Sequence, residues 1–224
     1  KRVKVIAGTG ANSTAEALEL TRHAKEAGAD ATLQVTPYYN KPTQEGLYLH
    51  HKAIAEAVDI PNILYNVPGR TSKNMLPETT LRLANDFENI IAVKEAGNDV
   101  HQYLQLLKNK PDDFLVISGD DDLALGIILA GGAGVISVLG QAITKEFTSM
   151  INLGLQGNAK ASYAIHFKLM QLTNLIFSEN NPAGIKAVFE ALNMCDATVR
   201  LPLVEATNEL KQQIKEAIKY LYKR

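Results

Sequence analysis

The stretch Ile90-Ile91-Ala92-Val93-Lys94-Glu95-Ala96 decides which fold this sequence predicts. It is a short apolar run with a polar end, and a similar run, Asn62-Ile63-Leu64-Tyr65-Asn66, lies about one strand–helix–strand unit earlier in the chain. If both runs are neighbouring parallel strands, which lie about 4.8 Å apart, Tyr65 and Lys94 lie side by side. The pair is then either a packed core tyrosine beside a lysine that reaches toward solvent, or a reactive site.

Six segments of the chain share this format of a β-rich run, a polar or glycine-bearing end, and a helical pattern. Continuous apolar runs indicate strands that are covered on both faces, as in parallel sheets. The predicted strands are residues 3–7, 31–36, 62–66, 90–94, 114–118 and 134–138. The helices predicted between them are residues 14–27, 44–58, 77–83, 99–109 and 121–130. This alternation predicts an α/β fold with a parallel sheet, either doubly wound or closed into a barrel.

Local signals mark where several helices begin and end. Ser13 and Glu16 have the spacing of a capping box, in which the two side chains satisfy free amides at a helix start. Gly28 ends the first predicted helix, and Pro77 suits the first turn of another because its missing N–H would be unpaired there. After residue 138 only helical patterns follow, at 144–153 with Thr144 as the cap, 158–177, 182–192 and 206–222. These patterns predict a C-terminal helical appendage.

Polar residues gather at the carboxyl ends of the predicted strands. They are Thr9, residues 36–39, Tyr65, Lys94, residues 118–120 and Ser137. A (β/α)8 TIM barrel places its active site at this end of its strands. Six units are visible where a barrel needs eight, and the chain opens directly on a predicted strand. We therefore expect a TIM barrel with units 3 to 8 present, residues 1–143 forming its core and residues 144–224 forming the last barrel helix and a C-terminal helical domain.

Composition and charge narrow the classes of protein. With 224 residues, of which 46% are hydrophobic, the chain can bury a full core. Its 23 lysine and arginine residues nearly balance 24 aspartate and glutamate residues, which argues against a nucleic-acid partner. No apolar run reaches the length of a membrane span, and no signal-peptide pattern is present. Cys195 is the only cysteine, which excludes an internal disulfide, so we expect a cytoplasmic globular protein without a membrane partner.

The chemistry of a strand-end lysine depends on its charge. A lysine attacks a ketone only as the free amine, and its reference pKa of about 10.4 falls when the side chain is buried. The apolar neighbours of Lys94 provide such surroundings, and Tyr65 on the next strand is placed to transfer protons. Arg70 follows in the same loop as Tyr65, and its planar guanidinium group can bind both oxygens of a substrate carboxylate.

Three other motifs have both a functional and a structural interpretation. Residues 120–122 are aspartates, but three consecutive residues of regular structure cannot all face one metal ion, and acidic residues also favour a helix start. His50 and His51 lie in a predicted helix without an acidic partner at metal-ligand spacing, which favours a solvated or packed face. Residues 131–134 are rich in glycine but precede a strand, which favours a tight connection over a phosphate site. We expect no metal and no cofactor.

Four motifs together resemble the dihydrodipicolinate synthase family of the pyruvate-dependent class I aldolase superfamily. They occur in matching order and spacing, and the resemblance covers essentially the whole chain. The motifs are Val35-Thr36-Pro37-Tyr38-Tyr39-Asn40, Tyr65-Asn66-Val67-Pro68-Gly69-Arg70-Thr71, Val93-Lys94-Glu95-Ala96 and Ser118-Gly119-Asp120-Asp121. The family's Gly-Thr-Thr-Gly-Glu motif, which supplies a catalytic threonine, does not occur in this sequence.

The resemblance implies a reaction and roles for individual residues. Lys94 would form an imine with pyruvate, and the resulting enamine would attack the aldehyde of L-aspartate 4-semialdehyde to give 4-hydroxy-tetrahydrodipicolinate in the diaminopimelate route to lysine. Tyr65 would relay protons, and Arg70 would hold the carboxylate of the semialdehyde. Tyr39 would enter the site of a neighbouring subunit. Gly119 and Ile136 match positions that line the pyruvate pocket.

The resemblance also implies regulation and assembly. Asn12, Glu16 and Tyr38 match positions that bind lysine as a feedback inhibitor in some members, although Asn12 and Glu16 also fit the start of a helix. The family is usually a homotetramer built as a dimer of dimers. Two alternatives stay open: another pyruvate-dependent aldolase, similar to sialic-acid lyase or to keto-acid aldolases, or an inactive barrel fragment that only self-associates.

Overall fold

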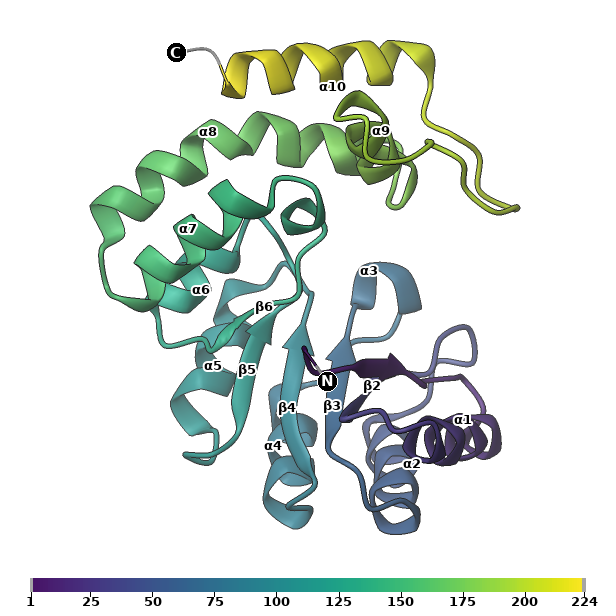
Figure 1. Ribbon diagram of the computed structural model, residues 1–224. Helices are drawn as coiled ribbons and strands as arrows, with labels where there is room; N and C mark the ends of the chain where they lie inside the picture. The colour runs from purple at the N-terminus through teal and green to yellow at the C-terminus, as the bar shows by residue number, and fades with distance from the viewer. Residues whose placement is uncertain (1, 223–224) are drawn as a thin grey trace. The chain divides into compact units, whose positions relative to one another are not determined.

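The chain forms two compact units in a computed structural model that describes residues 2–222. The first unit holds the chain up to Leu123 together with Ala130–Ile136. The second holds Ala124–Leu129 and the chain from Ser137 onward. Figure 1 follows the chain from the strands of the first unit to the helices of the second.

The first unit is built on a parallel sheet whose strands lie in sequence order. The strands are β1 (Ile6–Gly8), β2 (Ala31–Val35), β3 (Asn62–Asn66), β4 (Ile90–Glu95), β5 (Leu115–Ser118) and β6 (Gly134–Val135). Helices cover the sheet and follow its strands in turn, which gives a parallel-strand half-barrel (Figure 1). The predicted α/β fold with a parallel sheet is confirmed.

Two predicted strands differ from the structure by more than one residue at an end. The first begins at Ile6 and not at residue 3, because the segment before it bonds to Asp30: the Val5 amide donates to Asp30 Oδ2 at 2.9 Å. The pairing of β1 with β2 therefore starts only at Ile6 and Ala31. The last strand ends at Val135 and not at residue 138, because its partner β5 ends at Ser118, opposite Val135.

Side-chain caps start most helices of the first unit. Ser13 Oγ accepts the Glu16 amide before α1 (Thr14–Glu26), and Thr43 Oγ1 accepts the Gly46 amide before α2 (Gln44–Ala57). Asp99 starts α5 (Val100–Asn109) in the same way, through the His101 amide. The serine half of the predicted capping box is confirmed, and Gly28, with a φ of 82°, follows the end of α1 as predicted.

Proline at the first position starts the two other helices of this unit. They are α3 (Pro68–Thr71), which the sequence did not predict, and α4 (Pro77–Asp86), which runs three residues past its predicted end at residue 83. Apolar side chains of adjacent strands form a core cluster on the face of the sheet that carries the odd-numbered residues of β2 and β3. Its members are Ala31, Leu33, Ile63, Ile91, Ala92 and Ile117.

The second unit is helical in its described residues. It contains α6 (Ala124–Leu129), the 3₁₀ turn η1 (Leu139–Gln141), α7 (Thr144–Leu155), α8 (Ala159–Ser178), α9 (Ala183–Ala191) and α10 (Asn208–Leu221). Helix α8 packs against the other α-helices of this unit, and α9 approaches it so closely that a Cβ on Gly184 would lie 2.1 Å from the Ile176 carbonyl oxygen. The predicted helices are confirmed within a few residues at each end, except at α6.

The starts of α7 and α6 need a physical explanation. Thr144 is the first residue of α7 and not its cap; its hydroxyl reaches back to the Gln141 carbonyl at 3.4 Å. Helix α6 begins at Ala124 and not at residue 121, because Asp120 Oδ1 accepts the amides of Asp122 and Leu123 and holds them in a turn.

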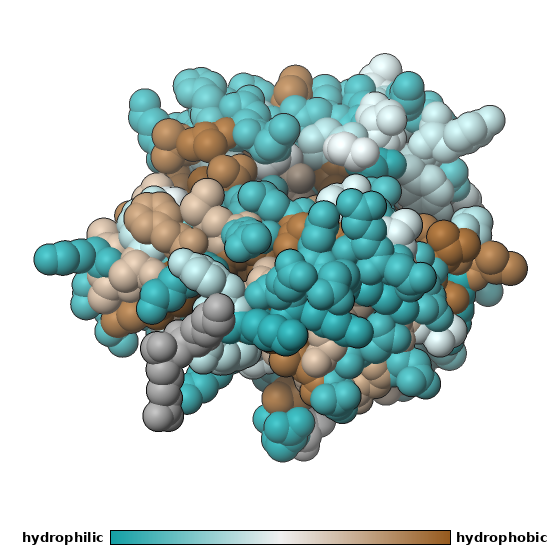
Figure 2. Space-filling model, turned by 90° about the horizontal axis from the view of Figure 1, so that it is seen from above, coloured by the Kyte–Doolittle hydropathy of each residue, from teal (hydrophilic) through white to brown (hydrophobic). Residues whose placement is uncertain are grey.

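The surface carries scattered apolar residues. Hydrophobic residues lie among hydrophilic ones on the face shown in Figure 2. In the second unit the exposed apolar side chains include Phe167, Leu201, Val204 and Tyr220. Among residues 2–222, no helix has both the length and the apolar character that a membrane crossing requires.

Candidate active site

Tyr65 and Lys94 lie directly beside each other at the carboxyl ends of β3 and β4. The two strands pair in parallel, and the register places Tyr65 opposite Lys94. Figure 1 shows the two strands side by side. Lys94 Nζ lies 4.1 Å from the centroid of the Tyr65 ring. The predicted juxtaposition is confirmed, and the amine lies within contact distance of the tyrosine ring.

The surroundings of Lys94 favour the neutral amine. The side chain is only partly exposed, and burial lowers the pKa of the amine below its ordinary value. The Asp121 carboxylate opposes this shift and the Arg70 guanidinium adds to it. A free amine is the nucleophile that attacks a carbonyl carbon, so burial shifts this lysine toward the form that covalent chemistry would require.

Tyr65 has the opposite shift for the same physical reason. Burial raises the pKa of its hydroxyl, and the nearby Arg70 guanidinium partly offsets the increase. The hydroxyl is therefore protonated near neutral pH and can donate a proton to an oxygen that leaves. Arg70 itself is exposed on the short helix α3, which directly follows β3.

Gly119 leaves the space that the lysine side chain occupies. A Cβ on this residue would lie 2.8 Å from Lys94 Cε and 2.6 Å from Ala96 Cβ. Its amide donates to the Glu95 carbonyl at 2.6 Å, which places it at the end of the neighbouring strand. The amide of Ile136 donates to the Ser118 carbonyl at 2.9 Å, so Ile136 lies at the same edge of the sheet.

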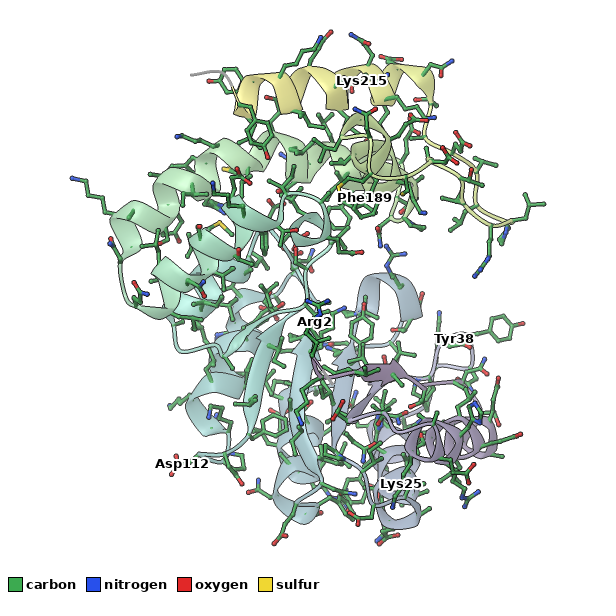
Figure 3. All side chains as sticks on the ribbon, in the orientation of Figure 1. Arg2, Lys25, Tyr38, Asp112, Phe189 and Lys215 are labelled. Carbon is green, nitrogen blue, oxygen red and sulfur yellow. The ribbon has the colours of Figure 1, made fainter. Side chains whose placement is uncertain are left out.

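The loop after β2 presents two tyrosines to the outside. Tyr39 is 88% exposed and adopts a left-handed backbone with a φ of 70°, and Tyr38 is 41% exposed. Figure 3 labels Tyr38 on this loop. A non-glycine residue at positive φ is uncommon and marks a conformation that its surroundings impose. Because its side chain is so exposed, the Tyr39 ring lies at the surface and does not pack against Lys94 of the same chain.

A hydrogen bond ties this loop to the start of α1. Asn40 Nδ2 donates to the Asn12 carbonyl at 2.8 Å. Tyr38 and Asn12, two of the residues predicted to bind lysine, therefore lie on connected segments. Glu16, the third, is exposed in the first turn of α1, and its amide donates to Ser13 Oγ at 3.5 Å.

The sequence did not predict a buried polar network behind this site. Glu95 is 1% exposed and accepts hydrogen bonds from Asn66 and Gln102. The signal for it was available, because Asn66 and Glu95 are polar at the strand positions that alternate with Tyr65 and Lys94. Such positions face the helix layer in a parallel sheet and are usually apolar.

The structural interpretations of the other motifs are confirmed. Asp120 holds the amides of a turn before α6, and Gly131, with a φ of 109°, forms the tight connection into β6. His50 and His51 are both buried on α2, and their ring centroids lie 4.9 Å apart. They form a packed face of this helix and not a solvated one.

A partly buried lysine beside a tyrosine, at the carboxyl ends of parallel strands, is an arrangement that suits the Schiff-base chemistry of class I aldolases. A family profile described as the Dihydrodipicolinate synthetase family matches residues 1–221. The chain belongs to this family, and the family predicted from four motifs is confirmed.

Similar proteins share both the sequence and the fold. The 4-hydroxy-tetrahydrodipicolinate synthase of Flavobacterium psychrophilum is 50% identical over 222 residues, which are 99% of this chain and 76% of that protein. The structure of the chloride-inhibited dihydrodipicolinate synthase from Acinetobacter baumannii complexed with pyruvate is 43% identical with a TM-score of 0.94, covering 99% of this chain and 76% of that one. The enzyme from Cyanidioschyzon merolae with lysine bound is 41% identical with a TM-score of 0.94, covering 97% of this chain and 74% of that one.

Proposed function

We propose that this protein condenses pyruvate with L-aspartate 4-semialdehyde through a Schiff base on Lys94, giving 4-hydroxy-tetrahydrodipicolinate for the diaminopimelate route to lysine. One observation carries this proposal: a lysine whose pKa is lowered by burial has its amine 4.1 Å from the ring of a partly buried tyrosine. The relatives named 4-hydroxy-tetrahydrodipicolinate synthase support the same reaction.

Covalent chemistry begins at the amine. The lone pair of Lys94 Nζ attacks the ketone carbon of pyruvate, and the carbonyl oxygen takes up a proton to give a carbinolamine. Tyr65, held in its protonated form by burial, donates to the hydroxyl that leaves as water when the imine forms. Loss of a methyl proton converts the imine into an enamine, whose terminal carbon attacks the aldehyde carbon. The amino group of the semialdehyde then closes the ring by displacing the lysine.

Other residues at this end of the sheet hold the substrates. Arg70 is exposed on α3 beyond Tyr65, where its guanidinium can bind the semialdehyde carboxylate through two parallel hydrogen bonds. Gly119 and Ile136 line the pyruvate side of the pocket, and the absence of a side chain at Gly119 leaves room for the lysine stem.

Assembly completes the site in this proposal. Tyr39 is 88% exposed in an imposed left-handed conformation, which suits a side chain that enters the site of a neighbouring subunit. We further propose that the six parallel strands are six of the eight strands of a TIM barrel with a C-terminal helical appendage, and that the enzyme is a homotetramer. The TM-scores with synthase structures support the barrel.

Lysine is proposed as a feedback inhibitor that binds near Asn12, Glu16 and Tyr38. The hydrogen bond from Asn40 to the Asn12 carbonyl joins two of these segments, and a structure of a similar enzyme contains bound lysine. Calorimetric titration of the protein with lysine tests this site. Heat of binding that is lost in Tyr38→Ala supports it, and the absence of both heat and inhibition rejects it.

The acceptor aldehyde distinguishes the proposed function from its alternatives. Two activities are measured for the wild-type protein and for Lys94→Arg. One is condensation of pyruvate with aspartate semialdehyde, and the other is cleavage of sialic acid. Condensation with the semialdehyde that is lost in Lys94→Arg supports the proposal. Cleavage of sialic acid in its place would assign the protein to the lyase-like branch, and activity that persists without Lys94 would refute Schiff-base chemistry at this residue.

A further inference from the structure

A buried carboxylate joins three segments immediately behind the reactive pair. Glu95, the residue after Lys94 on β4, accepts hydrogen bonds from Asn66 Nδ2 at 2.9 Å, Gln102 Nε2 at 2.9 Å and the Gly97 amide at 2.8 Å. These donors belong to β3, to α5 and to the loop after β4. The approach is close, since a Cβ on Gly97 would lie 2.9 Å from Glu95 Oε1.

The side-chain amides of Asn66 and Gln102 cannot exchange the positions of their oxygen and nitrogen atoms. The Oδ1 atom of Asn66 accepts the Met75 amide at 2.9 Å, so its Nδ2 must point toward Glu95. The Oε1 atom of Gln102 accepts from Asn74 Nδ2 at 2.8 Å, so its Nε2 must also point toward Glu95. Every hydrogen bond to the carboxylate is therefore donated by a group whose orientation is fixed, and this environment suits a side chain that only accepts.

The network lies on the other side of the sheet from the reactive pair. Side chains alternate between the faces of a strand, so Asn66 and Glu95, which are register partners, point away from the face that carries Tyr65 and Lys94. The backbone of Glu95 is held as well. Its carbonyl accepts the Gly119 amide at 2.6 Å and the hydroxyl of Tyr103, so the end of β4 is tied to β5 and α5.

We propose that Glu95 is a positioning residue: its carboxylate fixes the ends of β3 and β4, so that Tyr65 and Lys94 stay side by side and the turn bearing Arg70 leaves β3 in a fixed direction. Asn66 is the last residue of β3. Met75, whose amide donates to the Asn66 side chain, lies after α3, so this hydrogen bond closes the loop that carries Arg70. The inference rests on the proposed function only for its effect on catalysis. Its structural part concerns the position of the Lys94 amine.

The test measures the titration of the Lys94 amine without any substrate. Wild-type protein, Glu95→Gln and Gln34→Met are labelled competitively with acetic anhydride across a pH series, and acetylation of Lys94 is read by mass spectrometry. In Glu95→Gln the new amide N–H faces donors that cannot turn, so the strand end loosens and water reaches Lys94. The expected result is a titration midpoint shifted to higher pH, because burial is what lowers the pKa of this amine.

Gln34→Met is the matched control. Gln34 is 1% exposed on β2 and donates to Thr9, Thr21 and Thr32, so its replacement disrupts a buried polar network of the same sheet without touching Glu95. We expect the Lys94 titration to stay unchanged in this variant. Equal shifts in both variants, or none in Glu95→Gln, would overturn the positioning role. If Glu95→Gln does not fold, Gln102→Met removes one donor and should shift the midpoint in the same direction.

Trapping of the pyruvate imine with borohydride is the second readout. A displacement of about 1 Å between reacting groups costs on the order of 100-fold in rate, so Glu95→Gln should form the imine at least about tenfold more slowly than wild type. Gln34→Met should form it at the wild-type rate, and equal slowing of both variants counts against positioning. A wild-type protein that never reacts with pyruvate would overturn the proposed function alone, because the labelling experiment still decides the role of Glu95.

Discussion

Acid should unfold this protein through the buried histidines His50 and His51. Both lie inside the packed face of α2, where burial lowers the pKa of His50 to about 4 and that of His51 to about 3. The His50 ring has one partner, since its Nδ1 lies 2.9 Å from Thr14 Oγ1, whereas neither ring nitrogen of His51 has a hydrogen-bond partner. A charged His51 ring would therefore have no acceptor for either N–H, and a charged His50 ring would leave its Nε2–H without one.

The direction of the effect follows from proton binding. In the unfolded chain both histidines titrate near 6.5, so between pH 6.5 and the folded pKa values the unfolded state binds more protons. The contribution of the two neutral histidines to the unfolding free energy is fully present above pH 6.5. It is lost as the pH falls toward the folded pKa values of about 4 for His50 and about 3 for His51. Each histidine costs about 1.4 kcal/mol per pH unit in this window, so the pair costs on the order of 5 kcal/mol between pH 6.5 and 4.5. That loss is comparable with the whole stability of a typical domain, about 5–15 kcal/mol.

Urea unfolding at a series of pH values between 7 and 4.5 measures this loss. His51→Leu should lower the pH dependence of the unfolding free energy by about 1.4 kcal/mol per pH unit, because one of the two proton-linked groups is gone. His23→Gln is the control, because it removes a histidine that is exposed on α1 and lies outside the packed face of α2. A His51→Leu profile that runs parallel to the wild-type profile would refute the reasoning.

Three further predictions concern the site. Tyr65→Phe keeps the ring and removes the proton donor, so imine formation with pyruvate should slow by about 100-fold or more, as measured by quenched-flow trapping; an unchanged rate would remove Tyr65 from the relay. Arg70→Ala should raise the KM for the semialdehyde far more than it slows imine formation, and equal losses in the two assays would contradict its role with the carboxylate. Gly119→Ala places a Cβ 2.8 Å from Lys94 Cε and should cost about 1–3 kcal/mol in urea unfolding and slow imine formation. Gly8→Ala, whose Cβ meets no atom within 4 Å, is its control, and equal behaviour of the two variants would refute the steric argument.

Periodicity and turn chemistry predicted the arrangement that matters most. The spacing of two apolar runs, taken with the repeated strand–helix pattern, predicted that Tyr65 lies beside Lys94, because the carboxyl ends of neighbouring parallel strands lie at the same edge of a sheet. Where the prediction of local structure was wrong, contacts distant in sequence decided the outcome. The Val5 amide donates a hydrogen bond to Asp30, so β1 begins later than predicted. Strand β6 ends early because its partner β5 ends at Ser118.

The partners of buried polar side chains were beyond reach of the sequence patterns. Strand alternation indicates that Glu95 and Asn66 face the helix layer, but only the structure shows that they hydrogen-bond to each other there. His50 and His51 likewise could be solvated or packed until the burial of α2 was known. A hydropathy pattern reports which face of an element is apolar, but it does not report which polar groups find partners across elements.

The most direct measurement of the chemistry at Lys94 is covalent trapping. The protein is incubated with pyruvate, reduced with borohydride and digested, and the peptide that spans β4 is sequenced by mass spectrometry. Reduction of a pyruvate imine should leave a stable adduct on Lys94, which pyruvate alone or borohydride alone does not produce. An unmodified Lys94, or an adduct spread over exposed lysines such as Lys25 and Lys108, would contradict Schiff-base catalysis at this residue.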